Sequence, residues 1–186
     1  MSRIKLFLLS ITFICGLALT SKAQAVPTME WPLPGLPDEY VITSDFGDHW
    51  QNQYCGGNKQ LHTALDLSTS IGTNVDSAYA GTVVASVVYN NDPYDERNFV
   101  TISHGSWTTT YHHIRPMVNW GQSVSMGQKI GEVNNHSGGS HLHFGVRDTS
   151  YSNTANRGRL PQNSPCGGDP AFPEYFVDPA NLNYNW

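Results

Sequence analysis

The stretch Ser140-His141-Leu142-His143-Phe144-Gly145-Val146 decides how this sequence of 186 residues is interpreted. Its apolar residues alternate with histidine and glycine, and a period of two predicts a β-strand with one apolar face and one imidazole face. Residues two apart on a strand lie about 6.6 Å apart, so His141 and His143 project to the same side. One imidazole can then bind a metal ion while the other reaches the water or substrate beside it. A histidine pair that is merely packed or solvated fits the same pattern.

A second candidate site lies in the segment Leu61-His62-Thr63-Ala64-Leu65-Asp66-Leu67-Ser68. The leucines have odd numbers, and His62 and Asp66 have even numbers. On a strand the two sets lie on opposite faces, so the imidazole and the carboxylate can face the same way. Four residues of straight strand would hold the Cα atoms about 13 Å apart, too far for both side chains to reach one ion bound at roughly 2.0 to 2.2 Å. His62 must therefore lie where the chain bends into the strand. An ordinary hydrogen-bonded pair is the alternative.

The segment Thr109-Thr110-Tyr111-His112-His113-Ile114 supplies a third candidate. On a strand, His112 and His113 point to opposite faces. At most one of them therefore joins a site built on the other two segments, and alternation alone does not choose between them.

The fold class follows from a series of short strand candidates separated by Gly, Asn, Asp and Ser. These candidates are residues 40–44, 64–68, 81–89, 99–103, 108–114, 129–133 and 141–147. No window of helical length keeps a 3.6-residue period. We therefore expect an all-β domain, a single antiparallel sandwich or partly open barrel with long loops, and a short helical turn at residues 179–182.

The first 25 residues predict an export signal. Arg3 and Lys5 precede an apolar run at residues 6–19, and Ala23-Gln24-Ala25 has the small-x-small form of a signal-peptidase site. The run is short for a membrane span of about 20 residues, so we expect cleavage and a secreted or periplasmic location without a membrane span. Residues 26–39, rich in proline, are then an extended lead-in, and residues 40–186 form one domain with a polar C-terminal tail.

Charge and cysteine content narrow the function further. Loss of the signal removes three of ten basic residues, so seven remain against fifteen acidic residues, a net charge of −8. This balance argues against nucleic acid and anionic membranes as partners, because both require clusters of Lys and Arg. Cys55 and Cys166 remain, and in an oxidising compartment they predict one disulfide. Neither lies in a Cys-x-x-Cys pair, so a thiolate metal site is not indicated.

Three motifs in register carry a family resemblance. His62-x-x-x-Asp66, Tyr111-x-His113 and His141-x-His143, in this order, resemble the motifs of the lysostaphin-type (LytM-like) zinc endopeptidases, which cut peptide links in bacterial peptidoglycan. Segments 43–47, 80–84 and 127–131 are similar to the strands and turn between those motifs. The likeness runs from about residue 40 to residue 147 and resumes at residues 177–179.

The resemblance implies a role for each motif residue. It makes His62, Asp66 and His143 the zinc ligands and makes His113 and His141 an uncoordinated catalytic pair, which selects His113 over His112. Two imidazoles and one carboxylate leave the fourth position of a tetrahedral zinc ion open to water, as a catalytic site requires. We expect His141 to act as the base and His113 to stabilise the oxyanion, and these two roles can be exchanged. Tyr111 needs no role beyond core packing.

The function implied is that of a secreted zinc metalloendopeptidase acting on the stem peptides or cross-bridges of peptidoglycan. The remaining histidines are not expected to act in catalysis: His49 and His136 in loops, His104 in a structural turn, and His112 facing away from the site. One rival is a non-catalytic LytM-like regulator of other wall hydrolases, which would lack site residues. Another is an iron oxygenase with two histidines and one carboxylate, which would leave His113 and His141 unexplained.

Overall fold

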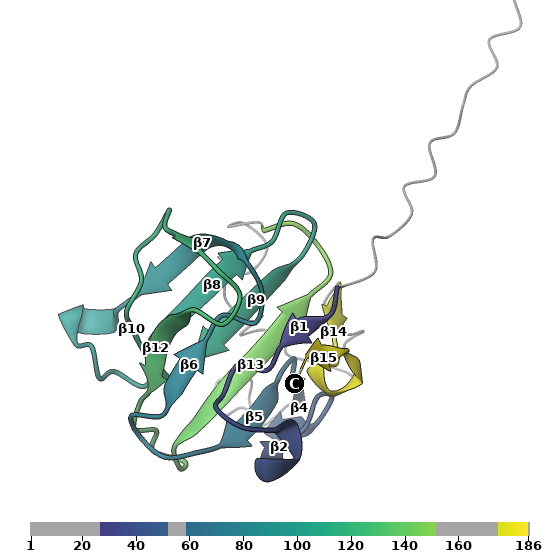
Figure 1. Cartoon of the computed structure of the whole chain (residues 1–186). Coiled ribbons are helices and arrows are strands. Elements are labelled where there is room, and N and C mark those ends of the chain that lie inside the picture. Colours follow the sequence, from purple (N-terminus) through teal and green to yellow (C-terminus); the bar gives the residue numbers. More distant parts are fainter. Residues whose placement is uncertain (1–26, 52–58, 152–174, 186) are drawn as a thin grey trace, which may run out of the picture.

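The computed structural model describes residues 27–51, 59–151 and 175–185 (Figure 1). Over these residues the chain forms β-strands joined by loops and by three short 3-10 helices: η1 (Pro37–Glu39), η3 (Tyr89–Asn91) and η5 (Pro179–Asn181). All strand pairs but one are antiparallel in the described part of the chain, and none of the sheets there closes into a barrel. The predicted all-β, antiparallel fold class is therefore confirmed.

One eight-stranded sheet forms the frame of the molecule. Its order is β11 (Ser123–Val124), β7 (Gly81–Val87), β8 (Phe99–Ser103), β9 (Thr108–His112), β13 (His141–Arg147), β5 (Leu65–Ser68) and β2 (Ile42–Ser44), with β14 (Phe176–Val177) paired to the end of β13. The strand that carries the His-x-His motif thus lies inside the sheet, between β9 and β5. Strands far apart in the sequence meet there.

The alternation in β13 sends its two faces to different surroundings. Leu142, Phe144 and Val146 are fully buried in the hydrophobic core, while His141 and His143 lie on the opposite face of the strand. Burying each of these apolar side chains stabilises the fold by about 1.5 to 3 kcal/mol. Because a slip of one residue would exchange the two faces, this burial also fixes which side the histidines occupy.

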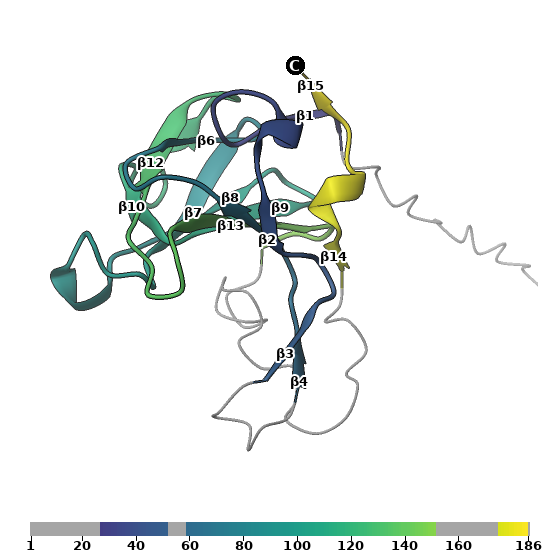
Figure 2. The same cartoon turned by 90° about the horizontal axis from the view of Figure 1, so that it is seen from below.

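A second, three-stranded sheet covers the apolar face of the first. It has the order β10 (Ile114–Pro116), β12 (Lys129–Val133) and β6 (Asn74–Asp76), and its buried residues Ile114, Ile130 and Val75 belong to the same core cluster as Phe144. Figure 2 shows this sheet on one side of the main sheet, with the ribbon of β3 (His49–Gln51) and β4 (Lys59–Leu61) projecting on the other. Among the described residues, the three-stranded sheet thus lies on the side of the main sheet opposite to the histidine face.

The extended segment after residue 26 is packed into this core. β1 (Met29–Glu30) pairs in parallel with β15 (Tyr184–Asn185), and Met29, Trp31 and Leu33 are all buried members of the core cluster. The rings of Trp31 and Tyr184 meet edge to face at 5.1 Å. The two ends of the described chain are therefore joined to each other and to the domain.

Most predicted strands agree with the observed ones, and residues 99–103, 129–133 and 141–147 match at both ends. The predicted strand 108–114 is wrong at one point, because His113 has a φ of +60° and separates β9 from β10. The prediction did not include strands β6 and β11. They have three and two residues and are too short to show alternation. The helical turn expected at 179–182 is η5, where Asp178 Oδ1 accepts a hydrogen bond from Ala180 N at 2.9 Å.

Several predictions fall outside the described residues. The export signal at residues 1–25 lies there, as do Cys55, Cys166 and nearly all of the tail between Asp148 and Phe176, so the disulfide stays a prediction. Within the described residues, none of the helices has the length and apolar character needed to cross a bilayer.

Candidate metal centre

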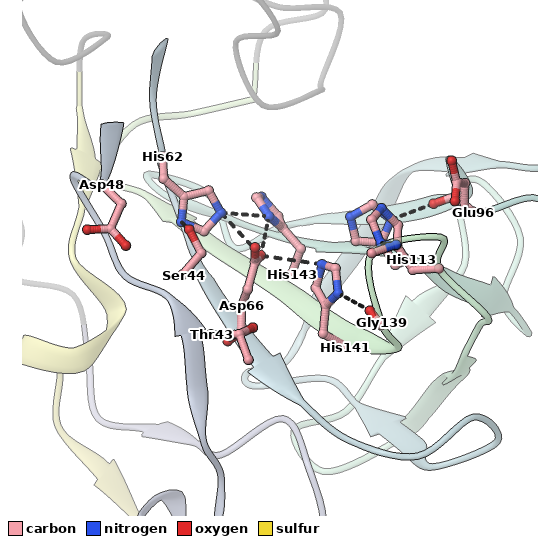
Figure 3. Close-up of polar contacts among 12 residues, drawn as sticks. Thr43, Ser44, Asp48, His62, Asp66, Glu96, His113, Gly139, His141 and His143 are labelled. Atoms are coloured by element: carbon pink, nitrogen blue, oxygen red, sulfur yellow. Dashed lines mark hydrogen bonds and ion pairs between the residues drawn. The ribbon is translucent and has the colours of Figure 1, made fainter. Parts of the chain in front are cut away.

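Asp66 and His143 are brought together by strand pairing. They lie directly opposite each other in the antiparallel pair β5 and β13, so both side chains project from the same face of the sheet. Asp66 Oδ1 lies 2.7 Å from His143 Nδ1 (Figure 3). Residues separated by 77 positions in the sequence therefore form one half of the site.

His62 reaches the same point from a bend, as the spacing predicts. β4 ends at Leu61 and β5 begins at Leu65, so the three residues between them are not in a strand. The imidazole of His62 is buried, and its Nδ1 donates a hydrogen bond to the main-chain carbonyl of Asp45 at 2.9 Å, with Ser44 Oγ at 3.2 Å. Nδ1 therefore carries the proton of the neutral ring, and Nε2 points toward Asp66 as an acceptor.

The three inward-facing atoms fit a zinc ion. His62 Nε2 lies 3.1 Å from Asp66 Oδ1 and 3.1 Å from His143 Nδ1, and the third side of the triangle is 2.7 Å. Ligand atoms around tetrahedral zinc with bonds of about 2.0 Å lie roughly 3.3 Å apart. When His62 is neutral its Nε2 carries no proton, so the lone pairs of Nε2 and of the Asp66 carboxylate face each other at 3.1 Å. An additional proton or a metal ion resolves this repulsion.

The electrostatics of the triangle favour a carboxylate anion. Burial alone would raise the pKa of Asp66, but hydrogen bonds and positive charge from His143 and His62 outweigh burial and hold that pKa well below its usual range. Burial also disfavours the charged form of both rings: it lowers the pKa of His143, whereas at His62 the attraction of Asp66 overcomes it and raises the pKa. One anion surrounded by imidazoles is a suitable ligand set for a divalent cation.

His141 and His113 lie beside this triangle. His141 Nε2 is 3.7 Å from Asp66 Oδ1, and its Nδ1 donates a hydrogen bond to the Gly139 carbonyl at 2.7 Å (Figure 3). The ring of His113 is centred 4.6 Å from that of His141 and 5.9 Å from that of His143. The structure thus brings all five predicted site residues to one place.

His113 is held in a neutral form. Its Nδ1 donates a hydrogen bond to the main-chain carbonyl of Glu96, so Nε2 is an acceptor. Burial, together with repulsion from His143 and His141, lowers the pKa of His113 to about 3. The main chain is fixed as well: Asn98 O accepts from His113 N at 3.0 Å, and His113 O accepts from Asn134 N at 2.7 Å.

His112 was expected to face away from the site, and that expectation is wrong. It lies directly opposite His143 in the β9 and β13 pair, and the two ring centroids are 5.5 Å apart. Strand alternation puts His112 on the site face, while the left-handed backbone at His113 turns that residue out of alternation and back to the same face. A rule based on regular alternation cannot anticipate this break.

His136 lies in a loop, as predicted, but it is part of the histidine cluster. Its ring is centred 4.3 Å from that of His113 and 4.6 Å from that of His141. The residue stands five positions before His141, and no pattern in the sequence marks it as a neighbour of His113. His49, also expected in a loop, belongs to β3.

Two other residues have structural roles. Tyr111 is fully buried, and its hydroxyl accepts a hydrogen bond from Ala78 N at 2.8 Å. Burial raises the pKa of this phenol to about 12. His104 is held between the Ala80 carbonyl and Thr109 Oγ1, each at 2.9 Å, in agreement with the structural turn expected there.

Comparison with known proteins gives one family match. Residues 60–156 match the sequence profile of peptidase family M23, a range that includes all five predicted site residues. Peptidoglycan DD-endopeptidase ShyA of Vibrio cholerae is 39% identical over 87 residues, which are 45% of this chain and 19% of ShyA. The uncharacterized lipoprotein YgeR of Escherichia coli is 33% identical over 133 residues, which are 70% of this chain and 50% of YgeR. The chain thus spans at most half of these relatives.

Solved structures agree on the fold. A zinc-containing peptidase from Vibrio cholerae superposes with a TM-score of 0.53 at 29% identity, over 72% of this chain and 38% of that one. The catalytic domain of lysostaphin from Staphylococcus simulans superposes with a TM-score of 0.50 at 27% identity, over 63% of this chain and 86% of that one.

Proposed function

Because this chain belongs to peptidase family M23, we propose that it is a zinc-dependent endopeptidase that hydrolyses peptide bonds of bacterial peptidoglycan. The observation that carries the proposal is the triangle of His62 Nε2, Asp66 Oδ1 and His143 Nδ1, with sides of 2.7 to 3.1 Å. The similarity to ShyA, a peptidoglycan DD-endopeptidase, supports the substrate class.

His62, Asp66 and His143 would hold the zinc ion. The hydrogen bond from His62 Nδ1 to the Asp45 carbonyl fixes the tautomer and the orientation of that ring, as is usual for histidine ligands. Three protein ligands leave one position open. When bound, zinc supplies a Lewis acid that polarises the scissile carbonyl and makes a water molecule acidic enough to attack near neutral pH.

His141 is assigned as the general base. Its Nδ1–H is held by the Gly139 carbonyl, so the neutral ring presents an unprotonated Nε2 3.7 Å from the Asp66 carboxylate. That nitrogen can take the proton of the attacking water and then give it to the leaving amine. General acid–base catalysis of this kind contributes roughly 10²- to 10⁴-fold to the rate.

The role of His113 is revised from the sequence-based expectation. An oxyanion stabiliser needs an N–H to donate, whereas the ring of His113 keeps its single proton on Nδ1, against the Glu96 carbonyl. The pKa of about 3, set by burial and by neighbouring histidines, opposes a second proton. We therefore assign His113 as a hydrogen-bond acceptor that orients the attacking water or a main-chain N–H of the substrate.

The proposal extends to location and domain limits. An export signal at residues 1–25 and a secreted or periplasmic site of action accord with a wall substrate. The lead-in at residues 26–39 belongs to the catalytic domain in this proposal, because Met29, Trp31 and Leu33 are buried in its core. An iron oxygenase is disfavoured, because it gives no role to His113 and His141.

Metal analysis and digestion of peptidoglycan test the proposal together. The purified protein should hold one zinc ion and release peptide fragments, identified by mass spectrometry, from defined peptidoglycans. His141→Ala should keep zinc and lose most of the cleavage. Stoichiometric zinc in the wild type without cleavage would favour the regulator, and absence of zinc binding would overturn the proposal.

A further inference from the structure

A second group of potential metal ligands lies next to the first. His113, His136 and His141 each offer one ring nitrogen, and these three atoms lie within 4.8 Å of one another. The ring centroids are 4.3 to 4.6 Å apart. The group comes from the break after β9, the loop after β12 and the start of β13, so three separate parts of the chain converge on it.

The hydrogen bonds of two of these rings suit metal binding. His113 and His141 both donate Nδ1–H to main-chain carbonyls, of Glu96 and Gly139. Each neutral ring therefore has an unprotonated Nε2, and that of His141 lies 3.7 Å from Asp66 Oδ1, at the boundary between the two groups. Histidine ligands in proteins usually have this arrangement, in which the second nitrogen is held by a carbonyl or carboxylate.

The third ring binds after one adjustment. His136 Nδ1 accepts a hydrogen bond from Gly138 N at 3.1 Å, so the neutral ring carries its proton on Nε2. Metal binding at Nε2 requires that proton to move to Nδ1 or leave, and it breaks the bond to Gly138. The cost is about 1 kcal/mol, because Gly138 is exposed and its N–H can turn to water.

Glu96 holds the two loops of this group together. Its main-chain carbonyl accepts from His113, and its carboxylate accepts from Ser137 N at 2.9 Å, next to His136. The carboxylate also places a negative charge near the His136 ring. The group is therefore preorganised, and because His113 and His136 are only partly buried, it is open to ions from solution.

We propose that His113, His136 and His141 form a second site for a late first-row divalent ion such as Zn²⁺, and that an ion bound there inhibits the peptidase. Three imidazole nitrogens favour Zn²⁺, Cu²⁺ or Ni²⁺ over Mg²⁺ and Ca²⁺, which prefer oxygen ligands. An ion on Nε2 of His113 and His141 occupies the two lone pairs that we assign to the reaction. The inhibition rests on the proposed function, whereas the binding does not.

Metal binding is tested without any assay of activity. The metal-free protein is dialysed against increasing buffered concentrations of free Zn²⁺, and the bound zinc is measured by elemental analysis. Wild type should bind two equivalents in two steps. His136→Gln should lose the second equivalent and keep the first. Glu96→Ala keeps the main-chain carbonyl that accepts from His113, and it should weaken binding of the second equivalent by roughly tenfold. Asn135→Ala, at an exposed neighbour of His136, should bind like wild type.

Inhibition is tested on the same proteins with peptidoglycan as substrate. Each protein is normalised to its own activity with one equivalent of Zn²⁺. Excess Zn²⁺ should suppress the wild type over the range in which the second equivalent binds, and His136→Gln should be far less sensitive. Mg²⁺ should have no effect on either. A single equivalent in wild type, a second equivalent that survives in His136→Gln, or a second equivalent that raises activity would each overturn the inference. If no protein cleaves peptidoglycan but the second equivalent behaves as expected, the proposed function fails and the second site stands.

Discussion

His112 and His143 face each other across strands β9 and β13, with ring centroids 5.5 Å apart and planes inclined by 67°. His112 is in turn stacked on Phe99, at 4.7 Å and 8°. His143 uses Nδ1 toward Asp66, and its buried Nε2 has no hydrogen-bond partner among the described residues. The His112 ring is therefore one of the contacts that orient this proposed ligand, together with Asp66 and the ring of His62, whose centroid is 4.8 Å away.

Replacing His112 should loosen His143. We expect His112→Ala to lower zinc affinity about tenfold, the lower end of the effect of removing a supporting residue. His112→Phe keeps a flat ring on Phe99 and should lose much less. Competition with a chromophoric chelator measures both affinities. Equal losses in the two variants would show that the imidazole acts through a polar contact rather than through packing.

Replacing Asp66 should abolish the metal centre. Asp66→Asn keeps the size of the side chain but removes the anion that His62 and His143 surround. The variant should lose bound zinc and with it Lewis-acid assistance of about 3 kcal/mol. The rate of peptidoglycan cleavage should therefore fall by at least about 100-fold. Asp38→Asn, at an exposed carboxylate of η1, is the matched control and should change neither quantity. Full zinc content in Asp66→Asn would contradict the assignment.

His104 should make stability depend on pH. Burial lowers its pKa to about 4 from an ordinary 6.5, against the hydrogen bond to the Ala80 carbonyl. Between these values the unfolded chain binds the proton and the folded chain does not, so stability is full above pH 6.5 and falls as the pH drops toward 4. We expect a loss on the order of 2 kcal/mol, allowing for partial exposure of the ring.

Urea unfolding in the presence of a chelator measures this contribution. The difference between wild type and His104→Gln should shrink from pH 6.5 to 4, because the variant lacks the titrating group while all other groups are shared. Parallel pH profiles for the two proteins would show that His104 does not have the lowered pKa.

Tyr111 should matter for stability and not for the metal. Its hydroxyl accepts from Ala78 N in the core, so Tyr111→Phe leaves a buried N–H without its partner, at a cost of about 1 to 3 kcal/mol. Zinc stoichiometry should be unchanged. Tyr94→Phe, at a ring that is 66% exposed, should leave the free energy of unfolding as it is. A loss of zinc in Tyr111→Phe would assign the phenol to the site after all.

The sequence by itself determined most of the main sheet and much of the candidate site. Alternation in residues 141–147 is a local pattern with a period of two, so it predicts both the strand and the face on which His141 and His143 lie. The bend at His62 followed from chain length alone, since a straight strand cannot bring it to Asp66. The choice of His113 over His112 came from the family resemblance and not from the pattern of residues.

Only the tertiary structure decided which other histidines face the site. The φ of +60° at His113 depends on its main-chain hydrogen bonds to Asn98 and Asn134, residues 15 and 21 positions away by their numbers, and no local pattern encodes such contacts. That one break allows His112 and His113 to face the same side, and the Glu96 contact with Ser137 N holds the loop of His136 beside them. Periodicity reports the direction of a side chain within one strand, but the neighbours of a loop are set by contacts between distant segments.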